Sequence, residues 1–250
     1  MRAFTRMFWS RQIMRVLPMF LIALTAGPAL SRDCRQALVL ALDVSGSVNP
    51  TEYAQQVEGL ATALNDPQVR ALILVGAAAP VSLAVFEWSS RNHQHLIQPW
   101  TVLDSDAALD AAILRIRSHL KVRAGLKTAL GTALNRAADL LQDQSHCWKR
   151  TIDVSGDGKN NIGATPGQVY AFGGFSGITV NALVVGDPAK ASGEGGGTSL
   201  AELLTYYETQ VILGPDGFAM VANGYEDFAR AMRRKLMREI SLPMFGQKQP

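Results

Sequence analysis

The feature that most constrains the fold is a short apolar run that ends abruptly in polar residues and leads into a helix signal. Residues 37–42, "ALVLAL", are apolar without interruption, which is typical of a strand buried on both faces of a parallel sheet. Asn49, Pro50 and Glu52 fit the cap, the first position and the third position of a helix, whose apolar residues recur at helical spacing as far as Leu64. A buried strand that feeds a helix predicts a parallel α/β arrangement.

The rest of the chain continues this alternation. Apolar runs predict two more buried strands at 150–154 and 179–185, and a strand pair at 81–88 and 94–100 joined by the turn "SSRN". The segments 210–213 and 218–221 flank a second turn, "GPDG". Helical spacing and alanine content predict helices at 107–116, 128–141 and 225–240. The segment 69–79 fits a strand or a short helix, and its alanines favour the helix. We expect one α/β domain, a Rossmann-like three-layer sandwich with a mainly parallel central sheet, an antiparallel edge strand and helices on both faces.

The first residues indicate export. Four arginines precede an apolar run at 16–26, and small residues follow it up to Ser31. This order is typical of a secretory signal peptide at 1–31, and the run is shorter than the roughly 20 residues of a membrane span. We therefore expect a periplasmic or extracellular protein without a stable membrane span after cleavage. A single domain at 32–245 and a disordered tail at 246–250 would follow, with a mobile "GEGGG" loop at 193–197.

Charge excludes one class of partner. The whole chain carries a net charge of +3, and residues 1–31 hold four arginines and no acidic residue, so removing them leaves 3 − 4 = −1. No basic face for nucleic acid remains. The basic residues of the last helix, which are Arg233, Arg234, Lys235 and Arg238, are expected on its solvated face.

Small oxygen-bearing side chains follow two of the buried strands. Asp43, Ser45 and Ser47 come after the first, and "SGDG", which contains Asp157, ends the strand at 150–154. In an open α/β sheet, ligands bind outside the carboxyl ends of the strands. Hydroxyls and carboxylates are hard ligands, which suit Mg²⁺, Mn²⁺ or Ca²⁺ rather than Zn²⁺.

With these residues the chain resembles the von Willebrand factor A-type fold over residues 36–240, and most of all a secreted bacterial branch of that family. The family's metal-ion-dependent adhesion site reads Asp-x-Ser-x-Ser after the first strand, a threonine in a later loop and an aspartate after the fourth strand. The resemblance places Asp43, Ser45 and Ser47 in the first three positions, Thr128 of "GLKTALGTAL" in the fourth and Asp157 in the fifth. All five follow in the family's order.

Each position also has a simpler structural interpretation. Ser47 suits the cap of the helix that follows it, and Thr128 suits the cap of the next predicted helix, with Thr132 as a rival ligand one turn later. Asp153 is expected to be a strand-end residue that bonds a neighbouring loop. Gly158, Asn160 and Asn161 are expected in the rim or in the second layer around the ion.

The resemblance implies adhesion through a metal ion. The ion, Mg²⁺ or alternatively Mn²⁺ or Ca²⁺, would bind a carboxylate of an unidentified partner protein. The rivals are a hydrolase in which the ion activates water, and a domain whose ion is purely structural. The only candidates for a catalytic base are Glu87 and Asp187. His93 and His95 are expected to be solvated strand residues. We therefore expect a binding module and not an enzyme.

The resemblance also implies a disulfide. Cys34 lies nine residues before Asp43, and Cys147 lies ten before Asp157. Strands one and four are neighbours in the resembled fold, so both cysteines would lie at the opposite end of the sheet. The spacing of neighbouring strands, about 4.8 Å, falls within the Cα separation that a disulfide needs, and export favours pairing.

Overall fold

The computed structural model describes residues 33–75, 79–122, 124–186 and 198–241. A six-stranded sheet has the order β3-β2-β1-β4-β5-β6, and its pairs are parallel except β2 with β3. The predicted mainly parallel sheet with an antiparallel edge strand is confirmed. The predicted signal peptide, "GEGGG" loop and tail lie outside the described residues. The strands are β1 (Cys34–Asp43), β2 (Val81–Trp88), β3 (Gln94–Leu103), β4 (Cys147–Gly156), β5 (Ile178–Gly186) and β6 (Ala219–Asn223).

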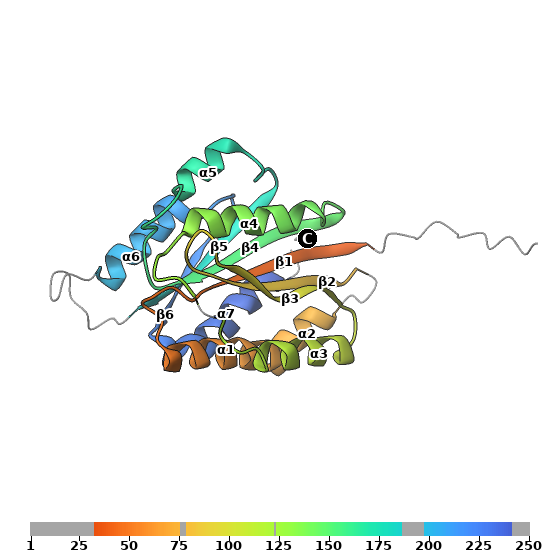
Figure 1. The fold of residues 1–250 in the computed structure, drawn as a ribbon. Coiled ribbons are helices and arrows are strands. Elements are labelled where there is room, and N and C mark those ends of the chain that lie inside the picture. The colour runs from red at the N-terminus through yellow and green to blue at the C-terminus, as the bar shows by residue number, and fades with distance from the viewer. Residues whose placement is uncertain (1–32, 76–78, 123, 187–197, 242–250) are drawn as a thin grey trace, which may run out of the picture. The chain divides into compact units, whose positions relative to one another are not determined.

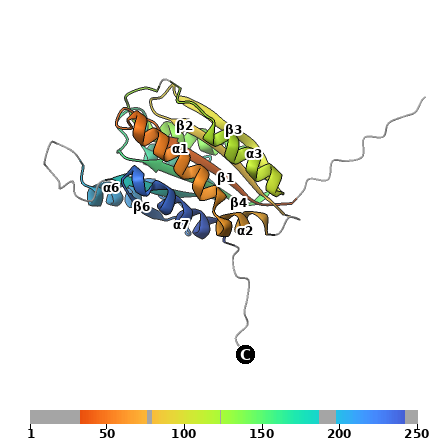
Figure 2. The same cartoon turned by 90° about the horizontal axis from the view of Figure 1, so that it is seen from below.

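Helices cover both faces of the sheet. Figure 1 shows α1, α2, α3 and α7 on one face and α4, α5 and α6 on the other, and Figure 2 shows the first layer from below. None of the helices in the described part of the chain has the length and apolar character to cross a membrane. The helices are α1 (Pro50–Asn65), α2 (Pro67–Leu74), α3 (Asp106–Arg117), α4 (Leu130–Gln142), α5 (Pro166–Phe172), α6 (Leu200–Tyr206), the π-helix η2 (Tyr207–Val211), the 3-10 helix η3 (Tyr225–Asp227) and α7 (Phe228–Ile240).

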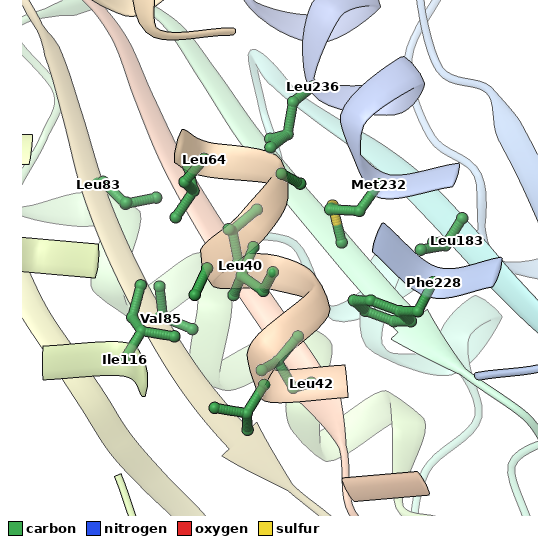
Figure 3. Close-up of a cluster of buried hydrophobic side chains, with 14 of the residues drawn as sticks. Leu40, Leu42, Leu64, Leu83, Val85, Ile116, Leu183, Phe228, Met232 and Leu236 are labelled. Atoms are coloured by element: carbon green, nitrogen blue, oxygen red, sulfur yellow. The ribbon is translucent and has the colours of Figure 1, made fainter. Parts of the chain in front are cut away.

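β1 lies at the centre of the sheet because it is apolar on both sides. All ten of its residues are buried, and alternate side chains enter two separate clusters, one under each helix layer. Figure 3 shows Leu40 and Leu42 in the cluster that α1 closes with Phe228 and Met232 of α7. Burying one such leucine contributes about 2 kcal/mol.

The register of β1 and β4 fixes both ends of the sheet. Cys34 lies opposite Cys147, and the two form a disulfide with a Cα separation of 4.4 Å that closes a span of 113 residues. The predicted disulfide is confirmed. At the other end Leu42 lies opposite Ser155, so Asp43 and the segment that begins at Gly156 leave the sheet side by side.

Two predictions about charged residues are wrong. Lys235 does not lie on a solvated face: its side chain is fully buried and its Nζ lies 2.6 Å from Oδ1 of Asp153. Nζ also contacts Glu239 one turn later, and Asn181 of β5 donates to the same carboxylate at 2.7 Å. Asp153 therefore bonds a helix beneath the sheet and not a loop at the strand end. Burial first and the nearby Glu239 second raise the pKa of Asp153 to about 8.

The C-terminal half also holds elements that the periodicity did not predict. α5 and α6 were not predicted, although each begins with a capping box, Thr165 with Gln168 and Ser199 with Glu202. The segment 210–213 does not pair with 218–221 across the turn. Its first part ends η2, and Leu213 makes one isolated bridge to Val180, while β6 pairs in parallel with β5. The loop that joins α4 to β4, residues 143–146, is short.

Candidate metal centre

The predicted oxygen cluster lies at the point where the chain changes sides of the sheet. α1 and α2 connect β1 to β2 on one face, whereas α4 leads into β4 on the other. The crevice outside the carboxyl ends of β1 and β4 is therefore the topological switch point, where open α/β sheets bind ligands. Asp43 ends β1 and Asp157 follows β4 directly, so both carboxylates lie at this crevice.

The structure brings the five predicted oxygen side chains together in one chain of contacts. The hydroxyl of Ser47 donates to Oδ1 of Asp157 at 2.7 Å, and it lies 3.3 Å from the hydroxyl of Ser45. Thr128 reaches the same Ser45 hydroxyl at 3.4 Å. Asp43 accepts the backbone N–H of Ser45 at 2.8 Å through Oδ1. Three separate loops thus contribute to one cluster.

Asp43 is the member of the cluster that most needs a cation. It is 1% exposed, and its Oδ2 is buried without a hydrogen-bond partner. Burial, and then the charge of Asp157, raise the pKa of Asp43 to about 8. Burial also raises the pKa of Asp157. A divalent ion beside two such carboxylates would reverse these effects, because it replaces the lost solvation with an opposite charge.

The spacing of the oxygens suits a small octahedral ion. Mg²⁺ binds oxygen at about 2.0–2.1 Å, so adjacent ligands of its octahedron lie roughly 3 Å apart. The three hydroxyl contacts in the cluster, at 2.7, 3.3 and 3.4 Å, are near this value. Hydroxyls and carboxylates are also the donors that Mg²⁺ and Mn²⁺ prefer. The residues therefore fit such an ion, with Ser45, Ser47 and Thr128 as hydroxyl ligands and Asp43 and Asp157 as carboxylates.

The simpler capping interpretations do not account for these hydroxyls. Asn49, not Ser47, caps α1 and accepts the backbone N–H groups of Thr51 and Glu52. α4 begins at Leu130, two residues later than predicted, and no side chain caps it. The Thr128 hydroxyl therefore does not cap a helix and is available to the cluster.

Two asparagines of the loop after β4 bond the segment that carries the threonine. Asn161 accepts the backbone N–H of Thr128 at 2.9 Å, donates from its own backbone to the Thr128 carbonyl at 2.9 Å, and contacts the hydroxyl at 3.4 Å. Asn160 accepts the N–H of Gly131 at 3.1 Å. Asn161 therefore contacts a member of the cluster directly, and Asn160 bonds the start of α4 beside it. Gly158 is half-buried nearby, where an added Cβ would lie 3.7 Å from the Thr128 hydroxyl.

A tyrosine from η2 supports the cluster, and no local pattern in the sequence predicts it. Tyr207 is fully buried, and its hydroxyl donates to the carbonyl of Gly158 at 3.2 Å. It packs so closely that a Cβ on Gly156 would lie 2.3 Å from this hydroxyl and 3.2 Å from Oδ2 of Asp43. Gly156 is therefore needed where β4 passes between the tyrosine and the carboxylate.

The rim of the cluster carries exposed apolar residues on one side. Leu126 is 81% exposed, and an added Cβ on Gly46, between the two serines, would lie 3.0 Å from its carbonyl oxygen. Leu120 is 83% exposed and precedes Lys121, whose Nζ donates to the carbonyl of Val48 at 3.0 Å. Leu126 is thus an exposed apolar side chain next to the oxygen cluster.

One candidate catalytic base is bonded to other side chains, and the other lies outside the described residues. Glu87 is fully buried and accepts the Tyr53 hydroxyl at 3.1 Å, while the Nε2 atoms of His93 and His119 lie 3.2 and 3.5 Å from its oxygens. These partners occupy both of its oxygens. His93 is thus mostly buried, contrary to the prediction. Asp187 lies outside the described residues.

The sheet order and the two helix layers match a von Willebrand factor A-type fold. Among solved structures, proximal thread matrix protein 1 from the mussel byssus matches with a TM-score of 0.59 at 16% identity, covering 83% of this chain and 49% of that one. Another structure of the mussel protein has a zinc-occupied MIDAS motif, which is the metal-ion-dependent adhesion site.

Two bacterial structures share the fold. A von Willebrand factor type A protein from Catenulispora acidiphila matches with a TM-score of 0.56 at 14% identity, covering 83% of this chain and 43% of that one. The pilus adhesin SpaC from Lactobacillus rhamnosus GG matches with a TM-score of 0.58 at 12% identity, covering 83% of this chain and 31% of that one. This chain therefore spans about half or less of each of these proteins.

The family is shown by sequence. The chain belongs to DUF1194, described as "Protein of unknown function", whose model matches residues 33–244. No curated protein sequence matches it.

Proposed function

We propose that this protein is an exported, metal-dependent protein-binding module whose divalent ion joins it to a carboxylate of a partner protein. The observation that carries the proposal is the chain of contacts from Asp157 through Ser47 and Ser45 to Thr128, next to Asp43, whose second carboxylate oxygen is buried without a hydrogen-bond partner. The zinc-occupied motif of the mussel protein and the adhesin among the structural neighbours support it.

The bound ion would supply an electron-poor centre that attracts an acidic ligand, because three of its protein ligands are neutral hydroxyls. Ser45 and Thr128 are buried and would fix its depth, whereas Ser47 and Asp157 lie at the open side of the cluster. Leu126 would exclude water on one side of the contact and add apolar area to it.

Export is part of the proposal. The disulfide between Cys34 and Cys147 fits an oxidising compartment, where such bonds persist. The arginine-led apolar segment at the N-terminus agrees with it. We propose binding rather than catalysis, because the described acidic side chains in the cluster, Asp43 and Asp157, are taken up as ligands, and Glu87 is engaged by Tyr53 and His93.

Metal-dependent capture tests the proposal. The purified protein is incubated with extracellular and envelope extract of the cells that produce it, in Mg²⁺ or in EDTA, beside Asp43→Ala and Leu126→Asp variants. We expect one or more proteins to be retained by the wild type in Mg²⁺ and lost with EDTA and with either substitution. Partner retention that is unaffected by EDTA would favour a purely structural ion, and metal-dependent turnover of ester or phosphate substrates would favour the hydrolase.

A further inference from the structure

The turn between β2 and β3, residues 89–93, lies directly beside the candidate metal site. The sequence predicts it only as the hairpin connection "SSRN". Asp43 lies opposite Trp88, the last residue of β2, and the N–H of Val44 donates to the Trp88 carbonyl at 2.8 Å. The turn therefore leaves the sheet next to the first carboxylate of the cluster.

The turn accepts three backbone N–H groups of the loop that leads into α4. The hydroxyl of Ser89 accepts the N–H of Gly125 at 3.0 Å, and its carbonyl accepts that of Ala129 at 2.8 Å. The hydroxyl of Ser90 accepts the N–H of Lys127 at 3.3 Å. These residues of the loop lie outside helix and strand, so side-chain hydroxyls of the turn replace the acceptors that regular structure would supply.

The metal-site threonine lies between the residues that bond the turn. Thr128 is flanked by Lys127 and Ala129, while its own N–H donates to Oδ1 of Asn161 at 2.9 Å. Two separate segments, the turn and the loop after β4, therefore hold the backbone around Thr128. Its hydroxyl lies 3.4 Å from the hydroxyl of Ser45 in this arrangement.

The turn itself is closely packed and fixed to the sheet. Ser89 is fully buried, and a Cβ added to Gly125 would overlap the side chain of Ser90, at 2.6 Å from its Cβ. On the other side, the N–H of Ser89 donates to the His93 carbonyl at 3.2 Å, and Nε2 of His93 lies 3.2 Å from Oε1 of the buried Glu87. The turn is thus a rigid support on which the loop rests.

We propose that Ser89 and Ser90 are positioning residues of the metal site, which set its affinity for the ion by holding the Thr128 hydroxyl in place. Residues that orient a metal ligand contribute about 10–100-fold to affinity. The coupling is reciprocal, so the bound ion also stabilises the contacts between the loop and the turn. This inference rests on the proposed function, because the divalent ion must bind at the cluster.

Titration calorimetry of the purified protein with Mg²⁺ and Mn²⁺ tests the effect on affinity. We expect binding to be about tenfold weaker in Ser89→Ala, and weaker still, by up to about 100-fold, when Ser90→Ala is added. The matched control is Ser105→Ala. The Ser105 hydroxyl also accepts a backbone N–H, that of Ala108 at 3.3 Å, but it precedes α3 at the other end of the sheet. The affinity of this control should stay within about twofold of wild type.

Two further backgrounds show whether the serines act through the threonine. Thr128→Val removes the hydroxyl ligand that the turn positions, so adding Ser89→Ala should then change the affinity by less than about twofold. Ser47→Ala removes a ligand of a different loop, so adding Ser89→Ala should still weaken binding about tenfold. An equal loss in both backgrounds would mean a general structural role and would overturn the inference.

Hydrogen exchange followed by NMR measures the same coupling in the wild type alone. Mg²⁺ should slow the exchange of the N–H groups of Gly125, Lys127 and Ala129 and leave that of Ala108 unchanged. Unchanged exchange at all three in a protein that binds Mg²⁺, or wild-type affinity when both serines of the turn are replaced by alanine, would overturn this inference and leave the proposed function intact. If the wild type binds neither Mg²⁺ nor Mn²⁺, both proposals fail.

Discussion

The buried group of Lys235, Asp153 and Glu239 makes a prediction that the substitution Asp153→Asn tests. One lysine faces two carboxylates, and all three side chains are at most 1% exposed. Burial and Glu239 raise the pKa of Asp153 to about 8 in the folded protein, from an ordinary value of 3.8. Between these values the folded chain keeps a proton that the unfolded chain releases.

The sign and the size of the effect follow from this difference. The free energy of unfolding falls as pH rises, by about 1.4 kcal/mol for each pH unit, because the folded state holds one more proton. From pH 5 to pH 7 the loss due to Asp153 is about 3 kcal/mol. Asp153→Asn keeps the shape of the side chain and removes the titration. The stability of the variant relative to wild type should therefore increase by about 3 kcal/mol between pH 5 and pH 7.

Urea unfolding in EDTA at the two pH values measures this change, and comparing variant with wild type cancels the titration of groups that do not interact with Asp153. Asp216→Asn, in an exposed turn, is the matched control and should show no pH-dependent difference. A relative stability of Asp153→Asn that changes by less than about 0.5 kcal/mol over the range would refute the reasoning.

Three further predictions concern the disulfide and the metal cluster. Replacing both cysteines by serine should lower the free energy of unfolding by about 2–4 kcal/mol in non-reducing urea titrations, because the disulfide closes a span of 113 residues in the unfolded chain. Unchanged stability would contradict this stabilising role. Asn161→Ala should weaken Mg²⁺ binding about 10–100-fold in calorimetry with little change in melting temperature, because Thr128 loses its support. Gly156→Ala should cost about 1–3 kcal/mol and disturb the site, because its Cβ meets the Tyr207 hydroxyl. Gly158→Ala, whose Cβ meets no atom closer than 3.7 Å, should keep near-native stability in the same unfolding assay.

The elements that could be predicted from sequence are those whose burial or start is indicated by the residue types of neighbouring positions. β1 is buried on both faces and is therefore an unbroken apolar run, and α1 shows its start through Asn49, Pro50 and Glu52. The spacing of Asp43, Ser45 and Ser47 is likewise local. Such signals need no knowledge of the partner segments.

The parts that could not be predicted depend on contacts between distant segments. Lys235 follows two arginines and looks solvated, and its burial depends on Asp153, 82 residues earlier, beneath a strand. Tyr207 supports the metal cluster only because η2 brings it under Gly156. α5 and α6 have seven residues each, too few for helical periodicity, and their local signals are a capping box each and Pro166 at the start of α5.

The central claim is that Asp43, Ser45, Ser47, Thr128 and Asp157 form one divalent-cation site. Titration calorimetry of the purified protein with Mg²⁺ and Mn²⁺ tests it directly, beside Asp43→Asn and Asp157→Asn variants whose folding is checked by circular dichroism. The account predicts one ion bound at this site in the wild type and none in either folded variant. Absence of binding of Mg²⁺, Mn²⁺ and Ca²⁺ to the folded wild type, or unchanged binding by the variants, would contradict it.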